Sequence, residues 1–246
     1  MKITAITDIG TYRDSNQDLY DFGTFETGDC WAIVCDGMGG VSGGQVASQI
    51  CVEHVASAIK KHYRKSLSVK AAKNLLQSAI SAANSIIYDK AQADITLKGM
   101  GTTIVAVILI KNIAVIAHVG DSRAYLMDSS VIEQITKDHS LVQVMIDNGK
   151  ITPEEAQTHP DKNIITRAVG VVNFVDVDFD VIDIDSGEKL LVCTDGLSGS
   201  VSEREMIDTV NNYNDSSTEK LVKMAIENGS KDNITVLLMD AEGQGE

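Results

Sequence analysis

Three aspartates stand where an apolar stretch meets a polar turn, which is where a site for divalent cations needs them. Residues 31–35 form a short apolar run that ends at Asp36, and residues 190–194 form another that ends at Asp195. Asp232 directly precedes a third apolar run. Mg²⁺ and Mn²⁺ prefer oxygen ligands, and a carboxylate at the end of a rigid strand is held in a fixed place. If the fold brings these strand ends together, the three side chains predict a metal centre.

A glycine follows each of the first two aspartates, as Gly37 and Gly196. Asp-Gly alone usually marks a turn, but after a strand it also lets a backbone carbonyl approach the same ion. One carboxylate can bridge two ions roughly 3.5–4 Å apart, and such pairs promote phosphoryl transfer. The glycine-rich residues 37–44 could instead cradle a phosphate. That alternative is weak, because the Gly-Lys-Ser/Thr ending is missing and Asp36 would repel a phosphate.

Composition limits the partners of this chain. Its 246 residues carry a net charge of −14, which argues against nucleic acid or an anionic membrane as the main partner. The N-terminus lacks a secretory pattern, and the longest apolar run, residues 103–110, is too short to span a bilayer. We therefore expect a cytoplasmic, monomeric protein with buried, reduced thiols at its four scattered cysteines. These are Cys30, Cys35, Cys51 and Cys193.

The elements that must position the aspartates are mostly antiparallel strands with two pairs of helices. Strand patterns occur at residues 2–8, 19–25, 30–35, 103–110, 113–118, 124–127, 131–135, 175–184, 190–194 and 234–239. Helical spacing of apolar residues covers 44–63 and 68–94. Capping boxes at Ser202 with Glu205 and at Ser216 with Glu219 begin two late helices. The pattern predicts an α+β sandwich of two sheets covered by helices, not alternating βαβ units.

The segment 136–170 differs from the rest, because it is polar and helical only in short pieces. We interpret it as a flap inserted into a single domain that covers residues 1–240. Residues 241–246 are expected to form a C-terminal tail.

Eight blocks of the chain, in order, resemble the motifs of bacterial PP2C-type (PPM) metal-dependent Ser/Thr protein phosphatases. They are TDIGTYRDSNQD (7–18), VCDGMGGVSGGQVAS (34–48), GMGTT (99–103), AHVGDSRAYL (117–126), ITKDHSLV (135–142), GKITPEEAQTHPDKNIITRAVG (149–170), LLVCTDGLSG (190–199) and KDNITVLL (231–238). The resemblance covers nearly the whole chain. It implies a four-layer α-β-β-α sandwich that hydrolyses phosphoserine and phosphothreonine esters with a metal-activated water and no phospho-enzyme.

The resemblance also implies a role for each site residue. Asp36 would bridge two Mn²⁺ or Mg²⁺ ions, one of which also binds the Gly37 carbonyl. Asp195 and Asp232 would complete the ligand set, and Asp18 would bind metal or its waters. Arg13 would clamp the phosphate, which suits a planar two-pronged donor. Bacterial members often hold a third ion, and Asp121 matches a ligand of that ion.

Other residues would orient these ligands. Asn233 follows a ligand, and Asp138 and His139 open the flap; we interpret all three as orienting groups, and His118 as a buried core histidine. Gln17 stands where many members have Glu, so its ion would depend on Asp36, Gly37 and water. Met38 replaces a histidine that animal members carry as a proposed general acid, so another group must protonate the leaving oxygen.

Two further functions remain open from the sequence. A catalytically silent phosphoprotein-binding module would be favoured by loss of the three strand-end aspartates, and all three are present. A hydrolase of small phosphoesters is hardly distinguished, because substrate choice would lie in the flap. The substrates expected from the resemblance are proteins phosphorylated by a Ser/Thr kinase.

Overall fold

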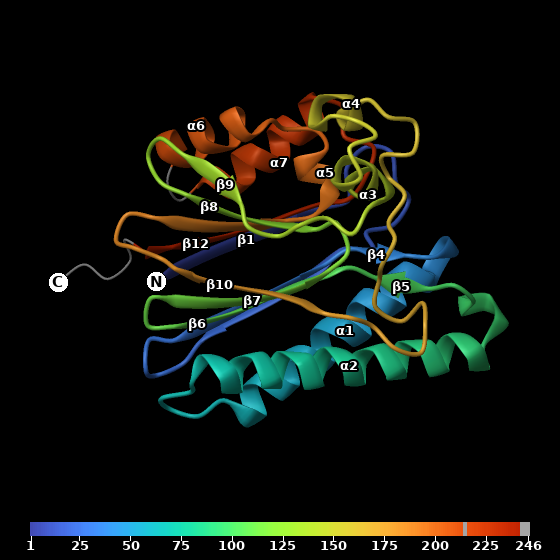
Figure 1. The fold of residues 1–246 in the computed structure, drawn as a ribbon, viewed down its shortest axis with the longest axis horizontal. Helices are drawn as coiled ribbons and strands as arrows, with labels where there is room; N and C mark the ends of the chain where they lie inside the picture. The colour runs from blue at the N-terminus through green and yellow to red at the C-terminus, as the bar shows by residue number, and fades with distance from the viewer. Residues whose placement is uncertain (214–215, 242–246) are drawn as a thin grey trace.

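The protein, seen here as a computed structural model that describes residues 1–213 and 216–241, is built on two five-stranded antiparallel sheets packed face to face (Figure 1). The first has the order β1-β12-β11-β8-β9 and the second β10-β7-β6-β3-β2. The first comprises β1 (Lys2–Asp8), β12 (Ile234–Asp240), β11 (Lys189–Cys193), β8 (Arg123–Met127) and β9 (Ile132–Gln134). The second comprises β10 (Asp178–Asp183), β7 (Ile113–Val119), β6 (Ile104–Ile110), β3 (Cys30–Cys35) and β2 (Leu19–Thr24). The predicted sandwich is confirmed.

Helices form the two outer layers, as Figure 1 shows. The long helices α1 (Gly40–His62) and α2 (Val69–Ala93) cover the second sheet. The helices α6 (Glu203–Tyr213) and α7 (Ser217–Glu227), with the short α5 (Asp195–Ser198), cover the first. The arrangement is the four-layer α-β-β-α sandwich that the resemblance implied.

The central strands are apolar on both faces because each sheet lies between two cores. In β3, Trp31, Ile33 and Cys35 pack into the core beneath α1 and α2. The alternate residues Ala32 and Val34 pack into the core between the two sheets. All six residues of β3 are buried, which explains the continuous apolar run. The edge strand β10 is only half covered, in agreement with its alternating sequence.

The segment between β9 and β10 lies beside the sandwich and carries two short helices, α3 (Leu141–Asp147) and α4 (Pro153–Gln157). Its first and last parts are joined by an antiparallel bridge between Ser140 and Ile165. A second bridge joins Thr102 to Val169 and connects the segment to the small sheet of β4 (Gly37–Met38) and β5 (Gly101–Thr102). The 3-10 turn η1 (Ile95–Leu97) precedes β5.

Two local predictions were wrong. The first long helix begins at Gly40, not at residue 44, so part of the glycine-rich segment is helical. Glycine propensity indicated a loop, but packing against β4 and β5 overrides it. The predicted box at Ser216 is not formed: among the described residues its side chain accepts no hydrogen bond from the helix amides, and its hydroxyl donates to the Tyr213 carbonyl. The box at Ser202 is present: the Ser202 amide donates to Glu205 Oε2, and the Glu205 amide donates to the Ser202 hydroxyl.

No helix within residues 1–213 and 216–241 is long and apolar enough to cross a bilayer. Of the predicted tail, residues 242–246 lie outside the described part of the chain.

Asn84 of α2 connects the helical layer to the end of the flap, which generates a stability prediction. Its side chain is 1 % exposed, accepts from the Gly170 amide at 2.7 Å and donates to the Val172 carbonyl at 3.0 Å. Asn84→Ala leaves both backbone groups without this partner and should cost about 1–3 kcal/mol in the free energy of unfolding. Urea denaturation measures this cost. The neighbouring Ser85→Ala is the control, and equal costs for the two changes would refute the structural role of Asn84.

Candidate metal centre

The antiparallel register of the first sheet places three strand ends side by side. Cys193, the last residue of β11, lies opposite both Val236 near the start of β12 and Arg123 at the start of β8. The end of β11 and the beginnings of β12 and β8 therefore meet at one edge. The residues that extend from these ends are Asp121, Asp195 and Asp232.

The second sheet supplies two more aspartates in the same way. Leu19, the first residue of β2, pairs with Cys35, the last residue of β3. Asp18 and Asp36, the residues just outside this pair, are therefore neighbours. Contacts across the sandwich join the two groups, because Asp18 is hydrogen-bonded to Thr194 and Thr235 at the ends of the first-sheet strands.

Asp18 is held by only one of its oxygens. Its Oδ2 accepts from the Thr194 hydroxyl at 2.9 Å and from the Thr235 hydroxyl at 2.7 Å. Its Oδ1 is buried and has no hydrogen-bond partner within residues 1–213 and 216–241. Asp195 Oδ1 is in the same condition. A buried carboxylate oxygen without a donor is costly, and a cation ligand removes that cost.

The backbone around Asp36 is fixed on both sides. Its amide donates to the Thr103 hydroxyl at 2.9 Å, and its carbonyl accepts from the Thr103 amide at 2.8 Å. The next residue must be glycine, because a Cβ on Gly37 would lie 2.2 Å from the Gly44 carbonyl oxygen and 2.6 Å from that of Gln17. Close packing of backbone against backbone thus sets the position of the Asp36 carboxylate.

Gly196, after Asp195, is required for the same reason: a Cβ there would lie 1.9 Å from the Asn233 carbonyl oxygen. Asp195 is the first residue of the short helix α5, where an acidic side chain is favoured by the unpaired N–H groups.

Arg13, on the exposed loop between β1 and β2, reaches the cluster by donating to Asp232 Oδ2. Asn233 holds this loop: its amide nitrogen donates to the carbonyls of Ile9 at 3.0 Å and Ser15 at 3.1 Å. Its oxygen accepts from the Gln17 amide at 2.8 Å. Asn233 therefore holds the loop that carries Arg13 against the start of β12. Gln17 contributes by its backbone, since its carbonyl accepts from the Gly37 amide at 3.1 Å.

The electrostatics of the cluster favour a bound positive charge. Burial, and then the neighbouring carboxylates, raise the pKa of Asp36 well above its ordinary value. The pKa is raised chiefly by burial to about 7 for Asp18, to about 8 for Asp121 and to about 6 for Asp195. Such shifts measure how much the fold disfavours the ionised forms, and divalent cations would reverse that preference. The buried oxygens without donors and the all-oxygen donor set therefore fit divalent metal ions.

Several residues that support the cluster have no local signal in the sequence. Thr194 and Thr235 bind Asp18, and the Thr103 hydroxyl lies 2.7 Å from that of Ser122 beside Asp121. These contacts depend on the register of strands far apart in the chain. Asp138, expected to be an orienting group, binds the Arg123 guanidinium through two hydrogen bonds of 2.9 and 2.7 Å.

The cluster opens into a cleft of about 1270 Å³ between the flap and the α5–α6 region. Arg13, Asp121, Asp195 and Asp232 contribute to its lining. The flap contributes α4 and the residues after it, including Lys162, and the opposite wall contributes residues 198–205. Solvent, metal ions and an extended substrate can reach the carboxylates through this cleft.

The raised pKa values predict how stability changes with pH when metal is absent. Asp18, Asp121 and Asp195 have folded-state pKa values of about 7, 8 and 6, above the ordinary 3.8. At a pH between 3.8 and the folded-state pKa of each group, the folded protein binds more protons than the unfolded protein. The free energy of unfolding therefore falls as the pH rises through this interval. The melting temperature in chelator should therefore decrease from about pH 5 to about pH 8, and excess Mn²⁺ should remove the decrease. Calorimetry measures both curves; a metal-free melting temperature that rises over this interval would contradict the assignment.

Comparison with known proteins places the chain in a family. Residues 12–234 match the family model described as Protein phosphatase 2C. The serine/threonine phosphatase Stp of Listeria welshimeri is 40% identical over 238 residues, which cover 95% of this chain and 93% of that protein.

Solved structures agree with the sequence comparison. The crystal structure of serine/threonine phosphatase Stp1 from Staphylococcus aureus matches with a TM-score of 0.91 and 36% identity, covering 96% of this chain and 93% of that one. The catalytic domain of the serine/threonine protein phosphatase PstP, solved in complex with two manganese ions, matches with a TM-score of 0.84 and 32% identity, covering 97% of each chain. With its family model, its fold and its aspartate cluster in agreement, the chain belongs to the protein phosphatase 2C family.

Proposed function

We propose that this chain hydrolyses phosphoserine and phosphothreonine esters of proteins by direct attack of water at its aspartate cluster. As a member of the protein phosphatase 2C family, it is a metal-dependent serine/threonine protein phosphatase. The observation that carries the proposal is a group of five neighbouring aspartates beside an exposed arginine at the edge of an open cleft. The pKa is raised for Asp18, Asp36, Asp121 and Asp195, and Asp18 and Asp195 each have a buried oxygen without a donor among the described residues.

The cluster would hold two Mn²⁺ or Mg²⁺ ions, with Asp36 as the ligand shared between them and Gly37 contributing its carbonyl. Asp195, Asp232 and Asp18 would complete this set, and Asp121 would help to hold a third ion. When bound, such ions activate water at neutral pH and neutralise charge on the phosphate. The two manganese ions in the PstP complex support a two-metal centre.

Arg13 would bind the phosphate of the substrate. A guanidinium has five N–H donors in a planar fork, and the described contact to Asp232 uses one nitrogen. The side chain is 53% exposed, so its remaining donors can face the cleft. Asp232 and Asn233 thus determine where Arg13 presents its fork.

The lining of the cleft supports attack by water without a phospho-enzyme. Among its described lining residues there is no cysteine and no histidine, two of the side chains that can accept a phosphoryl group. Aspartate can also accept one, but Asp121, Asp195 and Asp232 would be engaged as metal ligands. Cys193 and Cys35 lie near the cluster in sequence, but burial raises the pKa of both thiols, to about 12 for Cys193. Both are therefore protonated at neutral pH and poor nucleophiles.

The size of the cleft favours protein substrates over small phosphoesters. Its volume exceeds what one phosphate ester fills, and Lys162 and Lys231 also line it. We propose that the flap, about residues 136–170, belongs to a single phosphatase domain of residues 1–240 and contributes to the choice of substrate. The substrates would be targets of a Ser/Thr kinase. We further propose a monomeric, cytoplasmic protein, and the four free, buried cysteines support a reducing compartment.

A catalytically silent phosphoprotein-binding module is the second candidate. The same fold would serve, and Gln17 in place of Glu is the feature that favours it. The complete set of five aspartates favours an enzyme, because a module that only binds phosphate gains nothing from crowding carboxylates.

Asp195→Asn tests the metal assignment. The change keeps the shape of the side chain and removes its charge, so turnover of a phosphothreonine peptide in Mn²⁺ should fall by about 100-fold or more. Circular dichroism and the melting temperature in chelator should show a folded protein. Unchanged turnover would refute the assignment. If the wild-type protein binds the phosphopeptide but does not hydrolyse it, the silent module is identified instead.

Arg13→Ala tests the phosphate clamp. Hydrogen bonds to a charged group are worth about 1.5–3 kcal/mol, so kcat/KM for the peptide should fall by about 10- to 100-fold, mainly through KM. Arg64→Ala is the matched control, because Arg64 is exposed and donates only to backbone carbonyls within the described contacts. A fall in kcat alone would argue against a clamp.

A further inference from the structure

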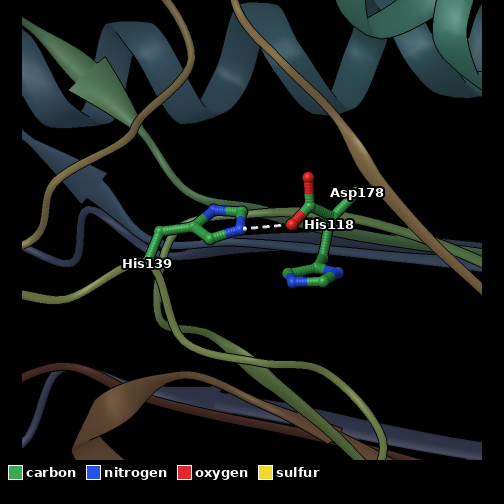
Figure 2. A group of neighbouring side chains, drawn as sticks. All are labelled: His118, His139 and Asp178. Atoms are coloured by element: carbon green, nitrogen blue, oxygen red, sulfur yellow. Dashed lines mark hydrogen bonds and ion pairs between the residues drawn. The ribbon is translucent and has the colours of Figure 1, made fainter. Parts of the chain in front are cut away.

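His118, His139 and Asp178 form a compact group beside the metal centre, shown in Figure 2. One ligand atom from each lies within 4.8 Å of the others. The two imidazole rings are stacked, with centroids 4.9 Å apart. Both histidines are buried, at 2 % and 8 % exposed. Spacing alone would suggest a metal site, so the hydrogen bonds must decide.

The hydrogen bonds of His139 argue against a metal ion. Its Nδ1 accepts from the Gly120 backbone amide at 3.0 Å. The proton of the neutral ring is therefore on Nε2, which donates to Asp178 Oδ2 at 3.1 Å. A ligating histidine shows the opposite pattern, with its free nitrogen donating and a lone pair toward the metal. Burial is the main cause that lowers the pKa of His139, so the neutral ring persists at pH 7.

His139 instead fixes the turn that carries Asp121. Besides the side-chain bond, the His139 backbone amide donates to the Gly120 carbonyl at 2.9 Å. Gly120 is therefore held at both of its backbone polar groups by one residue. Its φ is +108°, a value that glycine reaches at little cost. Because glycine adopts many other backbone conformations as readily, the two bonds to His139 are what select this one. Asp121 is the next residue in the chain.

The same histidine is joined to the end of the flap. Its carbonyl accepts from the Thr166 amide at 2.7 Å. Its partner Asp178, on the edge strand β10, accepts from Arg167 through Oδ1 at 2.7 Å. A continuous series of contacts thus runs from Arg167 through Asp178 and His139 to the Asp121 turn. His118 packs against the ring and is itself held by a 3.0 Å bond to the Lys137 carbonyl.

We propose that His139 is a positioning residue for the metal centre: Asp178 keeps its proton on Nε2, and Nδ1 holds the Gly120 amide so that Asp121 faces the cluster. The inference rests on the proposed role of Asp121 as a ligand of a third ion. The contact between the flap and β10 would then affect the affinity for that ion, through His139 and the Gly120 turn.

Two substitutions separate the two nitrogens of the ring. In His139→Asn, the amide oxygen can occupy the place of Nδ1 and accept from Gly120. In His139→Gln, the amide nitrogen can reach Asp178, but the acceptor for Gly120 is displaced. Loss of a group that orients a ligand typically costs about 10- to 100-fold in metal affinity. We expect His139→Gln to weaken the ion at Asp121 by that amount, and His139→Asn to stay within a few-fold of wild type.

The test is titration of the metal-free full chain with Mn²⁺ alone, counting bound ions by the paramagnetic resonance of free Mn²⁺. Asp121→Asn identifies which ion depends on Asp121, and His62→Gln, at the exposed end of α1, is the control. If Asp121→Asn changes neither the number nor the affinity of the bound Mn²⁺ ions, the proposed ligand role fails. If Asp121→Asn loses an ion that His139→Gln keeps at wild-type affinity, the positioning role fails and the ligand role stands.

A second measurement needs no substitution at His139. Long-range proton–nitrogen correlations in the wild-type protein should show Nε2 protonated and Nδ1 bare. The Asp178→Ala variant should fold, because the side chain is half exposed. It should show a mixture of the two His139 tautomers and a lower affinity for the ion at Asp121. A ring protonated on Nδ1 in the wild type would overturn the proposal.

Discussion

The cost of burying neighbouring carboxylates, to which their mutual repulsion adds, is the constraint on which the rest of the structure depends. Each of Asp18, Asp36, Asp121 and Asp195 would be easier to ionise in water, as its raised pKa shows. The fold overcomes this cost with apolar burial elsewhere, in a core between the sheets and a core under each helical layer. Without metal, the aspartate cluster lowers the free energy of unfolding and the apolar cores supply the stability. Cations that bind the folded protein at this cluster raise the free energy of unfolding.

An antiparallel sandwich suits this task because it brings strand ends together without bringing their sequences together. Asp18 contacts Thr235 across 217 positions of the chain. The centre consequently exists only when both sheets are complete. The carboxylates lie on turns whose backbones are closely packed, at Gly37 and Gly196, so neither turn can relax to relieve the repulsion. Rigid backbone, more than side-chain bonding, keeps the ligands in place, and one oxygen each of Asp18 and Asp195 is left for a cation.

Sequence reasoning succeeded where the physical signal was local. The apolar run of residues 103–110 predicts a strand, and β6 (Ile104–Ile110) is present with every residue buried. It failed where the outcome depends on register between distant strands. Nothing local distinguishes Thr194 and Thr235 from other strand threonines, yet their hydroxyls hold Asp18. The start of α1 at Gly40 was missed because glycine disfavours helix, and only packing against β4 and β5 makes helix there favourable.

Gln17 departs from the family pattern, but its side chain and backbone both form hydrogen bonds in the structure. Its amide nitrogen donates to the Gly40 carbonyl at 3.1 Å, a bond that a glutamate carboxylate could not make. Its backbone meanwhile binds Asn233 and Gly37 on either side of the cluster. The neutral side chain thus connects the loop carrying Arg13 to the start of α1, while adding no further charge to an already crowded site. The amide in place of a sixth carboxylate reduces the repulsion that the fold must overcome.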